Sequence, residues 1–480
     1  MLALCLQIVS CCSLFALLPA AANSAQSTTS DLKASALNDG QGTGMKIEDL
    51  KLDVQSATLE NGLTLVVLPN HRAPVVNHMI WYKVGSADEP AGQSGIAHFL
   101  EHLMFKGSQN FPDAAQSNFV AKHGGEENAF TSYDQTAFYQ TVASEHLPQL
   151  MQMEADRMRN MLITPEQVAT EKKVIIEERV QRVGNNPAQK LNEAVMAALY
   201  YAHPYRTPVI GWRHEIEALE RQEIYDFYHH WYAPNNAIVM LSGDVSFAEA
   251  MRFAQQSYGK LEPEPQDLSR NRPLEPEQHA ERRIELSDAR VGATQILLRY
   301  LAPSYHKKSA ERFDEQLNVA ALEVLVEILG GDGNARLNRI LVEENQESVA
   351  AGAYYDPVGL DYGSFVVYTV PAPGQSVAQA EQALNRELER VIDKGVTQKE
   401  VDTAISRMLI DLIYRQDSLT TLSRSIGRIL STGGEIDDVL HYPSILQAVS
   451  KEEVEQAAKI IFEPKNRVVA VMKPLEREES

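Results

Sequence analysis

Cysteine is nearly absent from this sequence and is confined to its amino terminus. The 480 residues include three cysteines, at Cys5, Cys11 and Cys12. Residues 1–30 also contain no charged residue, and an apolar run from Leu2 to Leu18 is followed by small residues. This pattern predicts a signal peptide over residues 1–25. The exported chain would keep no cysteine, which excludes disulfides and thiolate ligands, so any metal would need histidine and carboxylate ligands.

Positive charge is also scarce. The chain has 44 Lys and Arg residues against 65 Asp and Glu residues, a formal net charge of −21, which argues against nucleic acid as a partner.

Two other interpretations of the leader are a membrane anchor, for which the apolar run is slightly short, and a lipoprotein signal, which Ile8 to Cys11 matches weakly. We expect a periplasmic protein without a stable membrane anchor.

The length predicts more than one domain. We expect a flexible arm at 26–50, a first domain at 51–260, a proline-rich linker at 261–278 and a second domain at 279–480 that repeats the order of elements in the first. This organisation favours an α+β protein built from two similar half-domains. The expected elements are a hairpin at 57–69, strands at 74–84, 237–241, 293–300, 349–356 and 363–370, and helices at 94–106, 145–161, 165–183 and 312–329.

The chemically informative segment runs from His98 to His102, with the sequence His-Phe-Leu-Glu-His. On a helix, positions i and i+4 share one face, so His98 and His102 can bind one metal ion. Glu101 lies on the same face and is placed to deprotonate a water bound to that ion. A catalytic zinc site needs a third protein ligand and one open position. Chance occurrence of this short pattern, with histidines that are merely surface residues, is the competing interpretation.

A candidate for the third ligand lies on the helix expected at 165–183. Glu171 and Glu178 are seven residues apart, so two helical turns place both on one face. An acidic helix can also be simply a solvated surface, which is our interpretation of Glu177. Spacing alone does not choose between Glu177 and Glu178.

These segments together resemble the pitrilysin/insulinase zinc metallopeptidases, the inverzincins, in the short-chain branch that includes the mitochondrial processing peptidase β subunit. The resemblance spans residues 50–472. It implies one zinc ion held by His98, His102 and Glu178, with Glu101 as general base and Glu171 as a supporting catalytic residue. It also implies two homologous half-domains, each a mostly antiparallel sheet flanked by helices, that form one half of a clamshell chamber.

Another segment typical of this family runs from Gly124 to Asp134. The resemblance implies that Asn128 and Ala129 lie on an edge strand that pairs with the backbone of a peptide substrate, since such pairing depends little on side chains. The competing interpretation is an ordinary buried strand after a Gly-Gly turn.

The second half departs from the family pattern. Active relatives carry an Arg and a Tyr seven residues apart that bind substrate, whereas this sequence has Val342 and Val349, and neither can donate a hydrogen bond to an oxyanion. Tyr354, Tyr355 and Arg336 lack the right spacing. This absence predicts a heterodimer with a homologous subunit that carries the Arg/Tyr pair, a homodimer being the alternative.

The sequence therefore predicts an exported zinc-dependent endopeptidase that cuts peptides or unfolded segments. The alternatives are a non-catalytic structural subunit of a larger complex and a peptide-binding module that keeps a metal for stability. Rival chemistry has little support, because the sequence contains neither a phosphate-binding loop nor a G-x-S-x-G nucleophile elbow.

Overall fold

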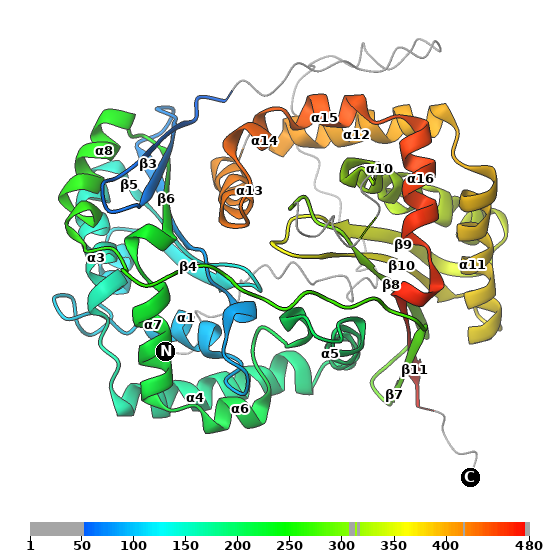
Figure 1. Ribbon diagram of the computed structural model, residues 1–480, viewed down its shortest axis with the longest axis horizontal. Helices are drawn as coiled ribbons and strands as arrows, with labels where there is room; N and C mark the ends of the chain where they lie inside the picture. Colours follow the sequence, from blue (N-terminus) through cyan, green and yellow to red (C-terminus); the bar gives the residue numbers. More distant parts are fainter. Residues whose placement is uncertain (1–51, 307–312, 314–316, 416–417, 476–480) are drawn as a thin grey trace.

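The computed structural model describes residues 52–306, 313, 317–415 and 418–475. The predicted signal peptide at 1–25 and arm at 26–50 lie outside these residues. Two sheets lie side by side with helices packed around them (Figure 1).

The first sheet has six strands in the order β1-β2-β6-β3-β5-β4. All neighbouring strands are antiparallel except β2 and β6. The hairpin predicted around Asn61 and Gly62 forms β1 and β2, and Gly62 has the positive φ of 87° that such a turn favours in glycine. The strands are β1 (Gln55–Thr58), β2 (Thr64–Pro69), β3 (Val75–Tyr82), β4 (Glu126–Thr131), β5 (Thr136–Ala143) and β6 (Ala237–Gly243).

The helices of the first half are mostly amphipathic, and all except α5 cover one face of this sheet, where their apolar side chains form a continuous core. The predicted helix at 165–183 ends as an α-helix at Arg179, and a π-helical segment follows at Val180–Gly184. The helices are α1 (Ile96–Met104), α2 (Ala115–Lys122), α3 (Leu147–Asn160), α4 (Pro165–Arg179), α5 (Pro187–Leu199), α6 (Arg213–Ala218), α7 (Arg221–Trp231) and α8 (Phe247–Gln256).

The second sheet has five strands in the order β7-β11-β8-β10-β9, and only β7 and β11 are parallel. In both sheets, counting from β2 and from β7, the strands follow the spatial order first, fifth, second, fourth, third. This shared topology confirms the predicted pair of similar α+β halves, which residue identity within the chain is too low to establish. The strands are β7 (Arg282–Asp288), β8 (Gln295–Ala302), β9 (Ser348–Asp356), β10 (Gly363–Pro371) and β11 (Arg467–Pro474).

The helices of the second half, except α13 and α14, form their own core against this sheet. The helix predicted at 312–329 begins at Val319, where the Asn318 side chain accepts a hydrogen bond from the amide of Ala320. The helices are α10 (Val319–Gly330), α11 (Val377–Lys394), α12 (Gln398–Arg415), α13 (Leu419–Ser431), α14 (Ile436–Leu440), α15 (Tyr442–Ala448) and α16 (Lys451–Ile461), and a further π segment spans Asn338–Glu344.

Each half covers the second face of the other half's sheet with one helix. Helix α5 of the first half packs on β7 and β11, and α13 of the second half packs on β3 and β6 (Figure 1). The segment between β6 and β7 contains no helix or strand after Lys260. The boundaries of the two domains and of the linker at 261–278 stay predictions.

Arg272, in the predicted linker, contacts both halves. Its guanidinium pairs with Asp88 at 2.8 Å and Asp134 at 2.6 Å, both in the first half, and with Asp361 at 2.7 Å in the second. The Arg272 side chain is only 4% exposed. Because breaking a buried pair leaves an uncompensated charge, this cluster fixes how the two halves meet.

Candidate metal and catalytic centre

The two histidines of the motif lie on α1, which is held at both ends. At its start, the two oxygens of Glu89 accept hydrogen bonds of 2.9 Å from the amides of Gly95 and Ala97. At its end, Arg157 Nη1 donates to the carbonyl of Met104 over 3.4 Å. A carboxylate at the first turn and a cation at the last both suit the helix dipole. These protein contacts therefore fix the direction of helix α1 without help from a ligand.

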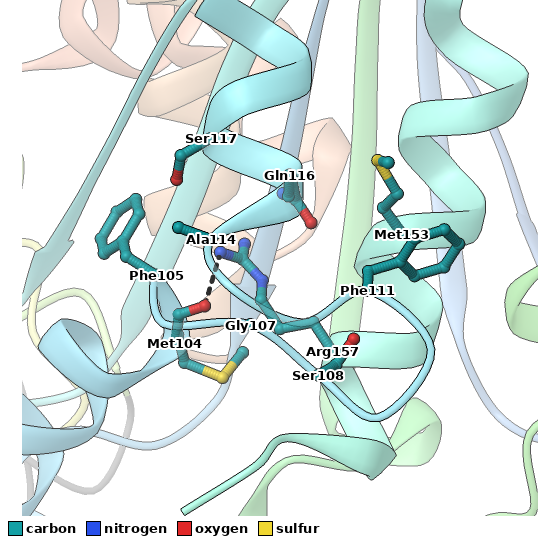
Figure 2. A pocket seen from close by; sticks show the side chains of 10 residues that line it. All are labelled: Met104, Phe105, Gly107, Ser108, Phe111, Ala114, Gln116, Ser117, Met153 and Arg157. Carbon is teal, nitrogen blue, oxygen red and sulfur yellow. Dashed lines mark hydrogen bonds between the residues drawn. The ribbon is translucent and has the colours of Figure 1, made fainter. Parts of the chain in front are cut away.

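Figure 2 shows Arg157 beside Met104, behind the carboxyl end of α1. The residues around them enclose a cavity of about 10 Å³, which has room for no more than about one water molecule. This cavity is too small to receive a peptide, and Arg157, which lines it, pairs with the buried Glu154. It supports the helix and is not a substrate site.

The structure brings together the three residues for which metal binding is predicted. One ligand atom each from His98, His102 and Glu178 lie within 4.8 Å of one another. Glu178 Oε2 is 3.7 Å from His98 Nε2 and 3.2 Å from His102 Nε2. Glu177, whose direction on α4 is turned by about 100° from that of Glu178, is exposed. In the folded chain, Glu178 and not Glu177 therefore lies beside the two histidines.

The donor set fits a divalent cation. Glu178 Oε2 is shielded from solvent and lacks a well-aligned hydrogen bond, although His102 Nε2 is near it. A buried carboxylate oxygen without a donor is costly unless a cation satisfies it. Two imidazole nitrogens and one carboxylate oxygen also form a known ligand set of catalytic zinc. Zinc therefore suits the residues present.

The protonation states of two of the three ligands, His98 and Glu178, agree with this fit. Burial, together with the charge of His102, lowers the pKa of His98 to about 3, so its imidazole is neutral and able to bind a metal. Burial opposes ionisation of Glu178, but the contact with His102 Nε2 at 3.2 Å and the charges of His98 and Arg182 lower its pKa to about 2. Burial also opposes a charge on His102, yet Glu171 and Glu178 raise its pKa to about 9. The carboxylates of Glu171 and Glu178 thus favour positive charge at the position of His102.

Glu101 is 5% exposed and lies on α1 between the histidines. Its Oε2 accepts a hydrogen bond of 2.6 Å from Thr131 Oγ1 at the end of β4. Burial raises the pKa of Glu101, and the Thr131 hydrogen bond opposes this rise. A carboxylate whose pKa is raised toward neutrality is suited to accept and return a proton.

Glu171 lies behind the metal cluster. Its Oε2 is 3.3 Å from His102 Nδ1, and its Oε1 pairs with Lys106 Nζ at 2.5 Å. Burial alone would raise the pKa of Glu171, but the bonds to His102 and Lys106 lower it. An ionised Glu171 would hold the His102 ring with Nε2 turned toward the cluster, as carboxylates commonly do beside metal-binding histidines.

Asn128 and Ala129 lie on β4, which is an edge strand of the first sheet. β4 pairs only with β5, in the register Asn128 to Tyr139 and Ala129 to Phe138. The Ala129 amide donates a hydrogen bond of 2.8 Å to the side chain of Asn128. Ala129 itself is buried. The edge position is what backbone pairing with a peptide requires, while pairing itself stays a prediction.

The second half offers no obvious replacement for the missing Arg/Tyr pair among the described residues. Arg336 forms a bidentate pair with Glu400 at 2.9 and 2.6 Å. Tyr354 Oη accepts from Arg299, and Tyr355 Oη donates to a backbone carbonyl. These candidates are engaged within their own half.

Three residues that contact the predicted site residues escaped the sequence analysis: Lys106, Thr131 and Arg182. Glu89, which accepts hydrogen bonds at the start of α1, escaped it as well. Arg182 could have been found, since it follows Glu178 by four residues and pairs with its Oε1 at 2.9 Å. The contacts of Glu89, Lys106 and Thr131 depend on tertiary folding and left no such signal.

Known proteins share both the fold and the sequence pattern. The insulinase (peptidase family M16) sequence model matches residues 65–212, and the peptidase M16 inactive domain model matches residues 218–408. The zinc protease PqqE of Helicobacter pylori is 26% identical over 426 residues, which cover 88% of this chain and 93% of that protein. The probable mitochondrial-processing peptidase subunit beta of Schizosaccharomyces pombe is 24% identical, with 87% and 91% covered.

Solved structures agree. A protease from Helicobacter pylori superposes with a TM-score of 0.79 at 25% identity, covering 88% of this chain and all of that one. The periplasmic protease PqqL of Escherichia coli shares the fold with a TM-score of 0.74 at 21% identity, covering 88% of this chain and 48% of that one.

Two halves of one topology, with a His/His/Glu cluster in the first half, define a duplicated α+β protein of the metallopeptidase type. The chain belongs to the insulinase family, peptidase family M16. The family resemblance seen in the sequence is thereby confirmed, and relatives are named zinc proteases. Among the described residues, no helix has the length and apolar character needed to cross a membrane.

Proposed function

We propose that this chain is an exported zinc-dependent endopeptidase that cleaves peptides or unfolded segments. One observation carries the proposal: Glu101 lies on the same helix as His98 and His102, with Glu178 beside them. His98, His102 and Glu178 would hold one zinc ion, which would supply a Lewis acid and an activated water when bound.

The residues around this position would each have a separate role in the reaction. Glu101 would take a proton from the attacking water and deliver it to the leaving amine. Thr131 would hold the carboxylate of Glu101 toward the reacting bond. Glu171 would fix the orientation of His102 through its 3.3 Å contact with Nδ1. The exposed edge of β4 would align the backbone of the substrate beside these groups.

The proposal includes a homologous partner subunit. Val342 and Val349 stand where active relatives carry hydrogen-bond donors, so a second chain would supply the Arg and Tyr and close the clamshell chamber. The similarity to a mitochondrial-processing peptidase subunit, which is named as one subunit of an enzyme, supports this view. A pair of identical chains is the alternative.

Export to the periplasm rests on the leader sequence and on one structural neighbour. Residues 1–25 have the composition of a signal peptide. The E. coli neighbour PqqL is described as periplasmic. Fractionation of a Gram-negative host that expresses the full chain would test this location.

The decisive experiment compares zinc content and peptide cleavage for the wild-type chain and Glu101→Gln, each alone and mixed with a homologous subunit. We expect one zinc per chain in both forms and cleavage only by the wild type. Bound zinc without cleavage in any mixture would overturn the enzyme proposal. Activity of the single chain equal to that of the mixture would overturn the partner proposal.

A second candidate function is a non-catalytic subunit of a larger complex. The observation that favours it is the pair of valines at 342 and 349, which leaves the second half without the expected donors. The buried Glu101 weighs against it, because a purely structural metal site has no use for a carboxylate held beside its ligands. Absence of cleavage in the mixture above would favour this candidate.

A further inference from the structure

Arg182 lies in the π-helical segment that follows the ligand helix α4. Its Nε is 2.9 Å from Glu178 Oε1, while Glu178 Oε2 faces the two histidines. One carboxylate group therefore separates this guanidinium from the position of the metal. π-helical segments occur frequently at functional sites, because they re-aim side chains that a regular helix would direct elsewhere.

The outer end of Arg182 has no partner in the part of the chain that the structure describes. The contact printed between Arg182 and Glu178 is made through Nε, no other described residue pairs with Arg182, and its side chain is 48% exposed. A guanidinium has five N–H donors arranged as a planar fork, so the two Nη groups remain available to a ligand. Lys106, the other cation beside the cluster, is occupied by Glu171.

The charge of Arg182 acts on the whole cluster. Burial raises the pKa of Glu101 and the charge of Arg182 opposes this rise, while the same charge helps to lower the pKa of Glu178 and of His98. When a divalent ion is present, the three carboxylates of the site face two protein cations and the two charges of the ion. The site then carries a net positive charge, although the whole chain carries −21. A carboxylate that approaches this point is attracted, whereas a basic side chain is repelled.

We propose that Arg182 binds a carboxylate of the substrate next to the bond that is cut, so that the enzyme prefers acidic residues there. This inference rests on the proposed function and names a specificity determinant for it. The Nη1 and Nη2 groups would make a bidentate contact, the arrangement that arginine forms best with carboxylates. The carboxylate could come from an Asp or Glu side chain or from the carboxyl terminus of a short peptide, and both sources present the same chemistry.

The experiment measures kcat/KM on matched peptide pairs with the zinc-loaded wild type in its active assembly. One pair carries Glu or Gln at positions flanking the cleaved bond, and the other carries a free or amidated carboxyl terminus. We expect the wild type to prefer the carboxylate form of one pair by roughly 10-fold, since a charge-assisted contact at a half-exposed site is only partly screened. The pair that shows the preference identifies the source of the carboxylate.

Arg182→Gln should bring this ratio to about one, because its amide cannot form a charged fork. Arg213→Gln is the matched control: Arg213 also pairs with a glutamate four residues away, Glu217 at 2.8 Å, but on the exposed helix α6. The ratio is measured within one preparation, so a change in zinc content or folded fraction cancels. No preference in the wild type, or a preference that survives Arg182→Gln, would overturn the inference.

A binding measurement separates this inference from the proposed function. The fluorescence anisotropy of labelled Glu and Gln peptides is followed with Glu101→Gln protein, with and without the Arg182→Gln change. We expect tighter binding of the Glu peptide, by several-fold, only when Arg182 is present. Equal rates of cleavage of neutral and acidic peptides would contradict only the role proposed for Arg182. Absence of all cleavage would contradict the proposed function and would not change the binding result.

Discussion

Thr131 Oγ1, at the end of the edge strand β4, donates a hydrogen bond of 2.6 Å to Glu101 Oε2 on helix α1. This contact joins the strand proposed to hold the substrate backbone to the residue proposed to move the proton. Peptide binding along β4 and the position of the general base are therefore physically linked. A substrate that shifts β4 would also shift the carboxylate.

Loss of this hydrogen bond should slow the chemical step while leaving the metal site intact. We expect Thr131→Val, which keeps the shape of the side chain but removes the donor, to lower kcat about 10-fold, in line with a hydrogen bond to a charged group. Thr131→Ser keeps the hydroxyl and should retain most of the activity. Steady-state kinetics and zinc analysis of both variants test this. An equal loss of activity in both, or a loss of zinc in Thr131→Val, would contradict it.

The choice between two neighbouring glutamates gives a second test. Glu178→Gln should lower zinc affinity by at least about 10–100-fold, because an amide oxygen carries no charge to offset the ion. Glu177→Gln should bind zinc like the wild type, since Glu177 is exposed and its Oε1 accepts only a hydrogen bond from Gln181. Zinc competition with a chromophoric chelator measures both variants. Equal affinities would exclude Glu178 as a ligand.

Much of the fold could be predicted from local signals. The hairpin predicted at 57–69 and the start of the helix predicted at 165 were confirmed, because turn and cap chemistry depends on a few adjacent residues, here Asn61, Gly62 and the capping Thr164. The grouping of His98 with His102 follows from helical spacing. The α-helical end of α4 at Arg179 was missed, because the π segment after it has no distinct composition.

The remaining features depend on contacts between distant residues. Glu177 and Glu178 differ only in which side of α4 packs on α1, and this depends on the tertiary fold. The hydrogen bond between Thr131 and Glu101 spans 30 residues. The exchange of α5 and α13 between the sheets has no local signature either, since an amphipathic helix reveals that it has an apolar face but not which sheet covers it.

The interdomain cluster around Arg272 should make stability depend on pH. Burial alone would raise the pKa of Asp361, but the contact with His203 Nε2 at 3.2 Å and the charge of Arg272 lower it to about 2. Because the pKa is lower in the folded state, the ionised carboxylate stabilises the fold above the unfolded-state value of about 4, and this stabilisation is lost as pH falls toward 2. We expect Asp361→Asn to lower the free energy of unfolding by about 2 kcal/mol at pH 7.

Urea unfolding of the wild type and Asp361→Asn between pH 3 and pH 7 measures this difference. The gap between the two proteins should be constant at pH 5–7 and shrink below pH 4. Asp332→Asn is the control, because Asp332 pairs with Arg407 at a site where both side chains are more than a third exposed. A gap that does not change with pH would show that Asp361 acts through packing and not through its charge.

The packing of α13 on the first sheet depends on Gly427. A Cβ atom at this position would come within 2.2 Å of the indole ring of Trp81 on β3, so α13 can approach the sheet only because residue 427 has no side chain. Gly427→Ala would gain helix propensity of up to about 1 kcal/mol, yet the clash with a fully buried ring should outweigh it and destabilise the protein by about 1–3 kcal/mol. Gly333→Ala is the control, since nothing lies within 4 Å of its added Cβ. Thermal unfolding, together with the intrinsic tryptophan fluorescence of the chain, compares the two variants. If Gly427→Ala is as stable as Gly333→Ala, α13 does not pack against Trp81 in solution, and the second half does not cover the first sheet as described.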